Sequence, residues 1–148
     1  EYICKRFENT GKHISPELAE EICRLVDNHS SYVQQLSWLL WIRTINTATT
    51  EQLSYALEDL LDQNNILFQS ETENLSAYQM NFLKAIVDGI HTKFSSKEVI
   101  SKYNLGTSAN IVRLKNALLQ KELIETNGKE IVLADPVFGV WFKKEMLY

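Results

Sequence analysis

The sequence predicts a mainly α-helical protein with one β-hairpin near its C-terminal end. Two observations predict this class: apolar residues recur at helical spacing along most of the chain, and a strong hairpin signal, Asn127-Gly128, separates two short β-prone runs. The expected helices are 1–10, 16–28, 31–46, 50–68, 77–88, 96–103, 108–121 and 136–146. The expected strands are 123–126 and 129–133.

Helix starts are marked by side chains that can accept a hydrogen bond from a free backbone N–H. Ser15 precedes Pro16, and proline suits the first position of a helix. A Ser or Thr followed three residues later by Gln or Glu fits the capping box, and four of the expected helix starts carry this pattern. These boxes begin at Ser31, Thr49, Ser76 and Ser95. Gly11 and Gly89 stand where the preceding helices should end.

Two domains are expected, a helical bundle at residues 1–70 and a second domain at 75–148. The polar run 69–74 interrupts the apolar periodicity between them. The third helix is apolar nearly all round, which is typical of a helix in the middle of a bundle. Its apolar residues are Leu36, Trp38, Leu39, Leu40, Trp41, Ile42 and Ile45.

The expected elements from residue 95 to residue 142 follow the order helix, turn, helix, hairpin, helix. This is the order of a winged helix-turn-helix, a module that usually binds DNA and sometimes binds protein. The candidate recognition helix is 108–121. Its buried face is predicted to hold Ile111, Leu114, Leu118 and Leu119. Its outward face is predicted to hold Ser108, Asn110, Arg113, Asn116 and Gln120.

The candidate binding residues are polar or basic side chains on and around this helix. Short polar groups and an arginine near the start of a recognition helix can meet phosphates and base edges. Lysines beside it can contact flanking phosphates. The predicted binding residues are Lys97, Lys102, Thr107, Ser108, Asn110, Arg113, Lys115, Asn116 and Lys129.

The same surface also fits a protein partner. Arg113 is the one arginine on the outward face, and Lys129 is the one base at the tip of the wing. In a two-residue Asn127-Gly128 turn, Glu125 would face Glu130 and give the wing an acidic pair. Double-stranded DNA and a protein partner therefore both stay open.

Composition excludes several classes of protein. The chain is 45% hydrophobic, and its two scattered cysteines, Cys4 and Cys23, suit reduced thiols. No apolar run reaches the ~18–20 residues that span a bilayer, and there is no signal peptide, so we expect a cytoplasmic protein with no membrane partner. Since Glu1–Phe7 already follows a helical pattern without an initial methionine, we expect a piece of a longer protein.

The charges divide unevenly along the chain. Residues 1–74 hold 5 basic and 12 acidic residues, a net of −7, and residues 75–148 hold 10 basic and 7 acidic, a net of +3. Such an asymmetry indicates two modules with different roles. His13, His29 and His91 are too dispersed for a metal site, and no nucleophile has a visible base partner. We expect no catalytic residue and no metal ligand in these residues.

Two groups of motifs resemble one family. Residues 2–7, 11–14 and 29–36, closing at Trp41, resemble the helical lid of archaeal-type AAA+/STAND ATPases. Residues 78–86, 103–108, 123–125 and 135–142 are similar to the winged helix that follows this lid. The most specific piece is Asp135-Pro136-Val137-Phe138-Gly139-Val140-Trp141-Phe142. The chain departs from the family at Ser30, where proline is common.

The resemblance implies a lid bundle followed by a winged helix, together forming the C-terminal regulatory part of an ATPase. The ATPase core would precede Glu1 and bind ATP and Mg²⁺, while this fragment would hold no cofactor of its own. His29 and Tyr32 are the residues that the resemblance places toward the nucleotide. The alternatives are a free-standing winged-helix transcription regulator and a protein-interaction scaffold without nucleic-acid binding.

Overall fold

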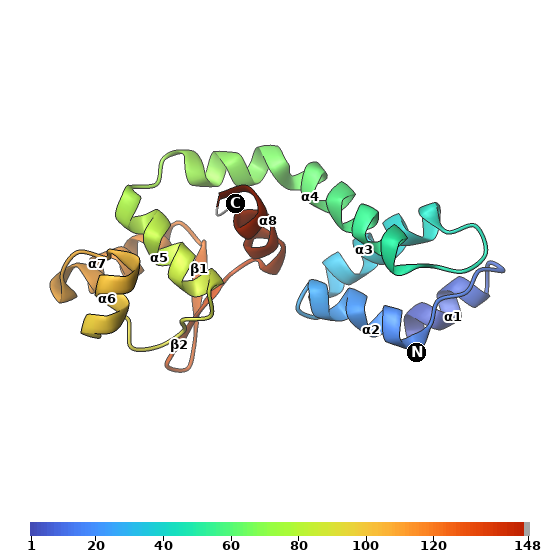
Figure 1. Cartoon of the computed structure of the whole chain (residues 1–148), viewed down its shortest axis with the longest axis horizontal. Coiled ribbons are helices and arrows are strands. Elements are labelled where there is room, and N and C mark those ends of the chain that lie inside the picture. The colour runs from blue at the N-terminus through green and yellow to red at the C-terminus, as the bar shows by residue number, and fades with distance from the viewer. Residues whose placement is uncertain (147–148) are drawn as a thin grey trace. The chain divides into compact units, whose positions relative to one another are not determined.

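The computed structural model describes residues 1–146 and confirms a mainly helical chain with one antiparallel hairpin. The chain forms two compact units, one of Glu1–Asn65 and one that starts at Ile66. Figure 1 shows the order of the elements. The helices are α1 (Tyr2–Glu8), α2 (Pro16–Leu25), α3 (Ser30–Arg43), α4 (Thr50–Glu73), α5 (Ala77–Val87), α6 (Lys97–Tyr103), α7 (Ser108–Gln120) and α8 (Pro136–Met146). The strands are β1 (Ile124–Asn127) and β2 (Glu130–Leu133).

The first unit packs α1, α2, α3 and the first part of α4 around a small apolar core. Phe7, Ile22, Leu36 and Leu40 are almost completely buried in it. The loop after α1 is held to the end of α3, because Lys12 Nζ donates to the Trp41 carbonyl at 2.8 Å. The same ammonium group lies 3.9 Å from the centroid of the Trp41 ring, which adds a cation–π contact.

Helix α3 is not the fully enclosed helix that its composition predicted. Only one face, with Leu36, Leu39 and Leu40, is buried, while Trp38 is 60% and Ile42 51% exposed. The prediction was wrong because a unit of this size supplies packing partners on one side of α3 only. The other side keeps large apolar groups at the surface.

Five of the eight predicted helix starts are confirmed, while the starts of α1, α3 and α6 are shifted by one residue, and α1, α2 and α3 end two or three residues earlier than predicted. Ser15 accepts from Leu18 N at 3.1 Å, and the capping boxes at Thr49 and Ser76 are both formed. Helix α3 begins after His29 without a side-chain cap, and α6 begins after Ser96, one residue later than predicted. The glycines that end α1 and α5 both have positive φ, 77° at Gly11 and 103° at Gly89.

Helix α4 is longer than the sequence indicated. The polar residues 69–73 were expected to leave the helix, yet α4 continues to Glu73. The reason is that Phe68 and Thr72, one helical turn apart, are both buried. The ring centroid of Phe68 lies 5.4 Å from that of Phe138 and 5.6 Å from that of Trp141, so packing against α8 sustains the helix.

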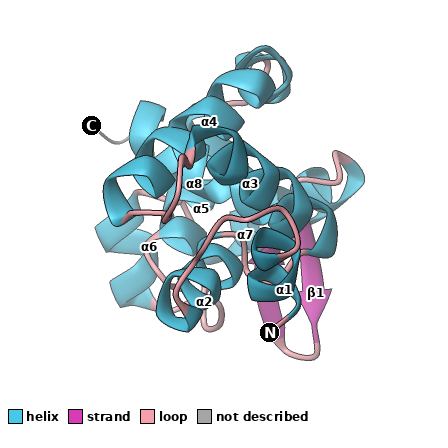
Figure 2. Ribbon diagram, turned by 90° about the vertical axis from the view of Figure 1, so that its right-hand side faces the viewer, coloured by secondary structure: helices cyan, strands magenta, loops and turns pink. Residues whose placement is uncertain are grey.

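The second unit combines the end of α4 with α5 to α8 and the hairpin, which Figure 2 shows in magenta. Its largest fully buried side chains include Phe82, Leu83, Phe138, Trp141 and Phe142. The carboxylate of Asp135 begins α8, since its Oδ1 accepts from Val137 N at 2.9 Å and Phe138 N at 3.2 Å.

The register of the hairpin corrects the predicted turn. Asn127 pairs with Glu130, so the turn residues are Gly128 and Lys129 rather than Asn127 and Gly128. Gly128 has φ 65°, whereas Asn127 and Lys129 keep negative φ, the pattern of a type II′ turn with glycine first. Glu125 consequently pairs with Val132, and the predicted Glu125–Glu130 pair does not form.

Candidate nucleic-acid interface

The turn between α6 and α7 contacts α5 at two points. Asn104 ends α6 in the left-handed conformation, with φ 53°, and its carbonyl accepts from Asn81 Nδ2 of α5 at 3.1 Å. Gly106 follows with φ 87°, and a Cβ at this position would lie 3.5 Å from the Tyr78 ring. The turn therefore sets the direction of α7 relative to α5.

Helix α7 presents a polar face of the kind that the sequence predicted. Ile111, Leu114 and Leu118 are buried and Leu119 is half-buried. Ser108, Arg113, Asn116 and Gln120 are exposed, as is Thr107 just before the helix.

Asn110 departs from the predicted outward face. Its side chain is only 9% exposed. Its Nδ2 donates to the Leu105 carbonyl at 3.4 Å, and its Oδ1 accepts a hydrogen bond from Arg113. A short amide so close to the turn can bond to the preceding backbone, and this contact turns Asn110 inward.

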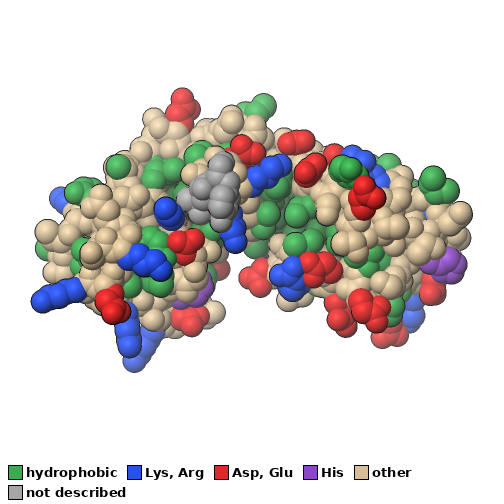
Figure 3. Space-filling model, viewed as in Figure 1, with side chains coloured by type: hydrophobic (Ala, Val, Ile, Leu, Met, Phe, Trp, Pro, Cys, Tyr) green, Lys and Arg blue, Asp and Glu red, His purple; other side chains and the backbone are tan. Residues whose placement is uncertain are grey.

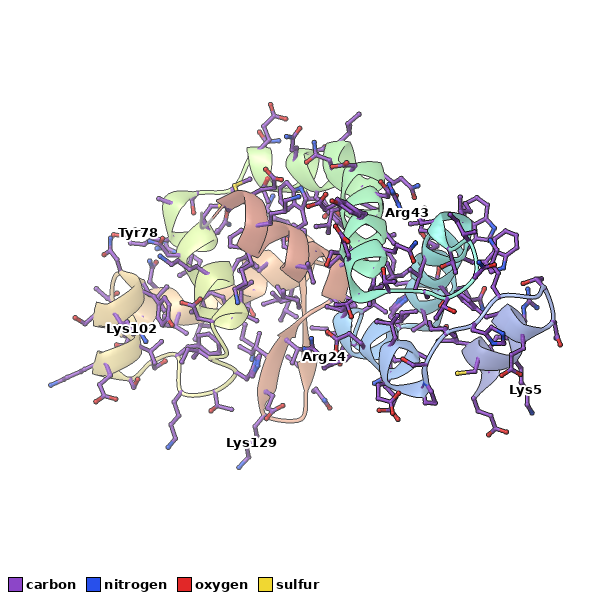
Figure 4. The ribbon with its side chains drawn as sticks, turned by 45° about the vertical axis from the view of Figure 1, so that its right-hand side comes forward. Lys5, Arg24, Arg43, Tyr78, Lys102 and Lys129 are labelled. Atoms are coloured by element: carbon purple, nitrogen blue, oxygen red, sulfur yellow. The ribbon has the colours of Figure 1, made fainter. Side chains whose placement is uncertain are left out.

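Three predicted lysines project from the second unit into solvent. Lys97 is the first residue of α6, Lys102 lies in its last turn, and Lys129 is at the tip of the wing. Figure 4 labels Lys102 and Lys129, and Figure 3 shows Lys and Arg projecting from the same unit. The Lys102 ammonium lies 5.4 Å from the centroid of the Tyr103 ring. Within residues 1–146, none of the three forms an ion pair with a carboxylate. Lys115 is half-buried.

Helix α6 is tied to α5 through Tyr103. The Tyr103 side chain is 6% exposed and lies near the Asp88 carboxylate. Burial raises the pKa of Tyr103, and Asp88 raises it further, while the nearby Lys102 ammonium acts in the opposite direction. Burial of Tyr103 thus packs the end of α6 into the second unit.

The order α5, α6, α7, hairpin, α8, with the hairpin attached beside the end of α5, is that of a winged helix. A family described as a probable winged helix domain matches residues 66–144. The chain belongs to this family. No curated protein and no solved structure matches the chain. In the winged helix, α7 occupies the position of the recognition helix and β1–β2 that of the wing.

The two residues that the ATPase resemblance placed toward a nucleotide lie together outside the winged helix. His29 is the N-cap residue of α3, and its ring centroid is 4.9 Å from that of Tyr32. Among residues 1–146 no group of three His, Cys, Asp or Glu side chains could hold a metal ion. None of the helices in this range has the length and apolar character required to cross a membrane.

Sequence reasoning missed two apolar members of the winged-helix surface. Val112 of α7 is 63% exposed and Tyr78 of α5 is 42% exposed. The signal for Val112 was available, because a residue between the buried Ile111 and Leu114 can fall on the opposite face at 100° per residue. Tyr78 carried no such signal, since it covers Gly106 far along the chain.

Proposed function

We propose that the chain is the C-terminal regulatory part of an AAA+/STAND-type ATPase whose winged helix binds duplex DNA under control of the nucleotide state. The observation that carries the DNA half is the exposed polar face of α7, together with three exposed lysines of the same unit, Lys97, Lys102 and Lys129, none of which pairs with a carboxylate within residues 1–146. A helix of this kind fits a major groove, and exposed lysines on the same unit can contact phosphates of the DNA backbone.

The charges allow a quantitative expectation for DNA binding. Three phosphate contacts give a slope of log K against log salt concentration of about −2.7, so affinity should fall roughly 40-fold between 50 and 200 mM salt. Loss of one lysine should reduce the slope by about one and weaken binding to every sequence to the same extent.

A labelled duplex titrated at several salt concentrations tests this half of the proposal. Lys97→Ala, Lys102→Ala and Lys129→Ala are each expected to lower the salt slope. Lys144→Ala is the matched control, because Lys144 is exposed on α8 and outside the proposed interface. Absence of salt-dependent binding would contradict the proposed DNA binding. So would a decrease of the salt slope in Lys144→Ala as large as in the three lysine variants.

The nucleotide half is supported by the lid-like motifs and by the position of His29 and Tyr32 at the start of α3, where both rings are close together. ATP and Mg²⁺ would bind to a core that precedes Glu1, and the first unit would close over the nucleotide. In the product of the complete gene, DNA affinity should differ between ATP and ADP, and His29→Ala should reduce the difference. Equal DNA affinity in the presence of ATP and of ADP would contradict control by the nucleotide state.

A protein partner is the second candidate, and one exposed apolar residue of α7 favours it. Val112 is 63% exposed in the middle of the outward face, where an apolar group suits a protein contact. Glu125 and Glu130 are also exposed on the wing. A scaffold without nucleic-acid binding predicts no affinity for duplex DNA at low salt, whereas a free-standing transcription regulator predicts DNA binding that no nucleotide alters.

A further inference from the structure

We propose that Arg113 recognises a guanine and that Asn110 is the positioning residue that holds its guanidinium group in the orientation for this contact. This inference rests on the proposed DNA binding. It assigns different roles to two neighbouring side chains that the sequence placed on the same outward face. Asn110 acts inside the protein, and Arg113 acts at its surface.

The orientation of the Asn110 amide is determined by its partners. Arginine has only N–H donors, so the atom that accepts from Arg113 must be Oδ1. The Nδ2 group then faces the Leu105 carbonyl, to which it donates at 3.4 Å. Both ends of the amide are therefore engaged, one by the turn before α7 and the other by Arg113.

The surroundings of Asn110 leave it little room to move. A Cβ on Gly106 would lie 2.9 Å from Asn110 Nδ2, closer than such atoms approach. Glycine thus leaves the space that the amide fills, and the Tyr78 ring would lie 3.5 Å from the same Cβ. Because Asn110 is only 9% exposed, it is part of the packed turn rather than of the solvated helix face.

Arg113 is exposed although one of its terminal nitrogens is bonded to Asn110. Its remaining N–H groups are available to a ligand. Guanine presents two adjacent acceptors, N7 and O6, in the major groove, and a guanidinium group can donate to both. A side chain that is already held in one place loses less conformational entropy on binding, so the Asn110 contact favours this geometry.

The experiment begins with selection of duplexes from a random pool by the 148-residue chain. In the selected site, guanines are replaced one at a time by 7-deazaguanine, which lacks the N7 acceptor. We expect one guanine at which the replacement weakens binding roughly 5- to 150-fold, the range for a bidentate base contact. Salt dependence should be unchanged by this replacement, since no phosphate contact is lost.

Two variants and one control separate the roles of the side chains. Arg113→Ala removes every donor of the guanidinium group and should bind the normal and modified duplexes with equal affinity. Asn110→Ala should reduce the ratio of the affinity for the normal duplex to that for the 7-deazaguanine duplex, though not to one, and should leave the salt slope unchanged. Asn116→Ala, at an exposed position on α7, should leave the ratio unchanged.

The outcomes distinguish this inference from the proposed function. If no duplex is bound, the proposed DNA binding fails and the inference fails with it. If duplex is bound in a salt-dependent manner but no guanine is sensitive to the replacement, or Arg113→Ala keeps the sensitivity, only the inference is overturned. If Asn110→Ala does not fold, Arg113→Ala still tests the guanine contact, and an unaltered ratio of the two duplex affinities in Arg113→Ala overturns it.

Discussion

Ile131 of the wing uses both of its backbone groups to bind His91. Its N–H donates to the His91 carbonyl at 2.9 Å, and its carbonyl lies 3.0 Å from His91 Nδ1. Since a carbonyl only accepts, Nδ1 must carry the hydrogen. In an antiparallel hairpin, alternate residues point their backbone groups away from the partner strand. The observed register places Ile131 at such a position, and the register predicted from an Asn127-Gly128 turn would not.

Removal of the His91 ring donor should loosen the wing. His91→Leu is expected to lower the free energy of unfolding by about 1 kcal/mol and to speed hydrogen exchange of the Ile131 amide. His91→Asn keeps an N–H near the position of Nδ1 and should restore most of the protection. NMR-detected exchange measures both effects. If His91→Asn and His91→Leu behave alike, the ring hydrogen bond does not hold the wing.

The end of α4 should contribute strongly to the stability of the winged helix. Phe68 is 1% exposed between Phe138 and Trp141, so Phe68→Ala should cost about 3–5 kcal/mol. Leu67→Ala is the matched control, because Leu67 is 54% exposed, and it should change stability by less than about 1 kcal/mol. Urea unfolding followed at the Trp141 indole NMR signal measures both. Equal losses of stability in the two variants would show that packing of Phe68 does not stabilise the winged helix.

Local signals in the sequence predicted most of the fold, and contacts between distant residues explain where they failed. The Ser76–Gln79 box and the presence of a hairpin depend on neighbouring residues, and both were predicted. The length of α4 depends on Phe68 meeting Trp141, and periodicity within α4 carries no information about that contact. The hairpin register likewise depends on His91, which lies far from the turn.

The candidate site shows the same limit at a single residue. Helical spacing placed Arg113 and Asn116 correctly at the surface of α7. The same spacing also placed Asn110 at the surface, because an asparagine in the first turn of a helix is expected to be solvated. Burial of Asn110 follows from the Leu105 carbonyl and the space beside Gly106, which only the folded turn brings together.

Gly106 should be among the least replaceable glycines of the winged helix. Gly106→Ala forces φ 87° on a residue with a side chain and brings its Cβ to 2.9 Å from Asn110 Nδ2. We expect a loss of at least about 1–3 kcal/mol in thermal or urea unfolding. Gly128→Ala is the matched control, since Gly128 has φ 65° but no atom within 4 Å of the added Cβ. A loss at Gly106 no larger than at Gly128 would contradict the close packing of Asn110.

Glu71 should make the stability of the second unit depend on pH. Partial desolvation raises the pKa of Glu71 above its ordinary value of 4.5, and the Asp135 carboxylate raises it further. A carboxyl group with a raised pKa binds its proton more tightly in the folded state. Its contribution is therefore most favourable below about pH 4.5 and is lost as the pH rises through the folded-state pKa.

Glu71→Gln, which cannot ionise, should consequently gain stability relative to the unaltered chain as the pH rises from 4 to 7. Glu73→Gln is the control, because Glu73 is exposed at the end of the same helix. Thermal unfolding of the three proteins across this range measures the difference. A constant difference between Glu71→Gln and the unaltered chain at all pH values would mean that the Glu71 carboxyl titrates in the same way in the folded and unfolded states.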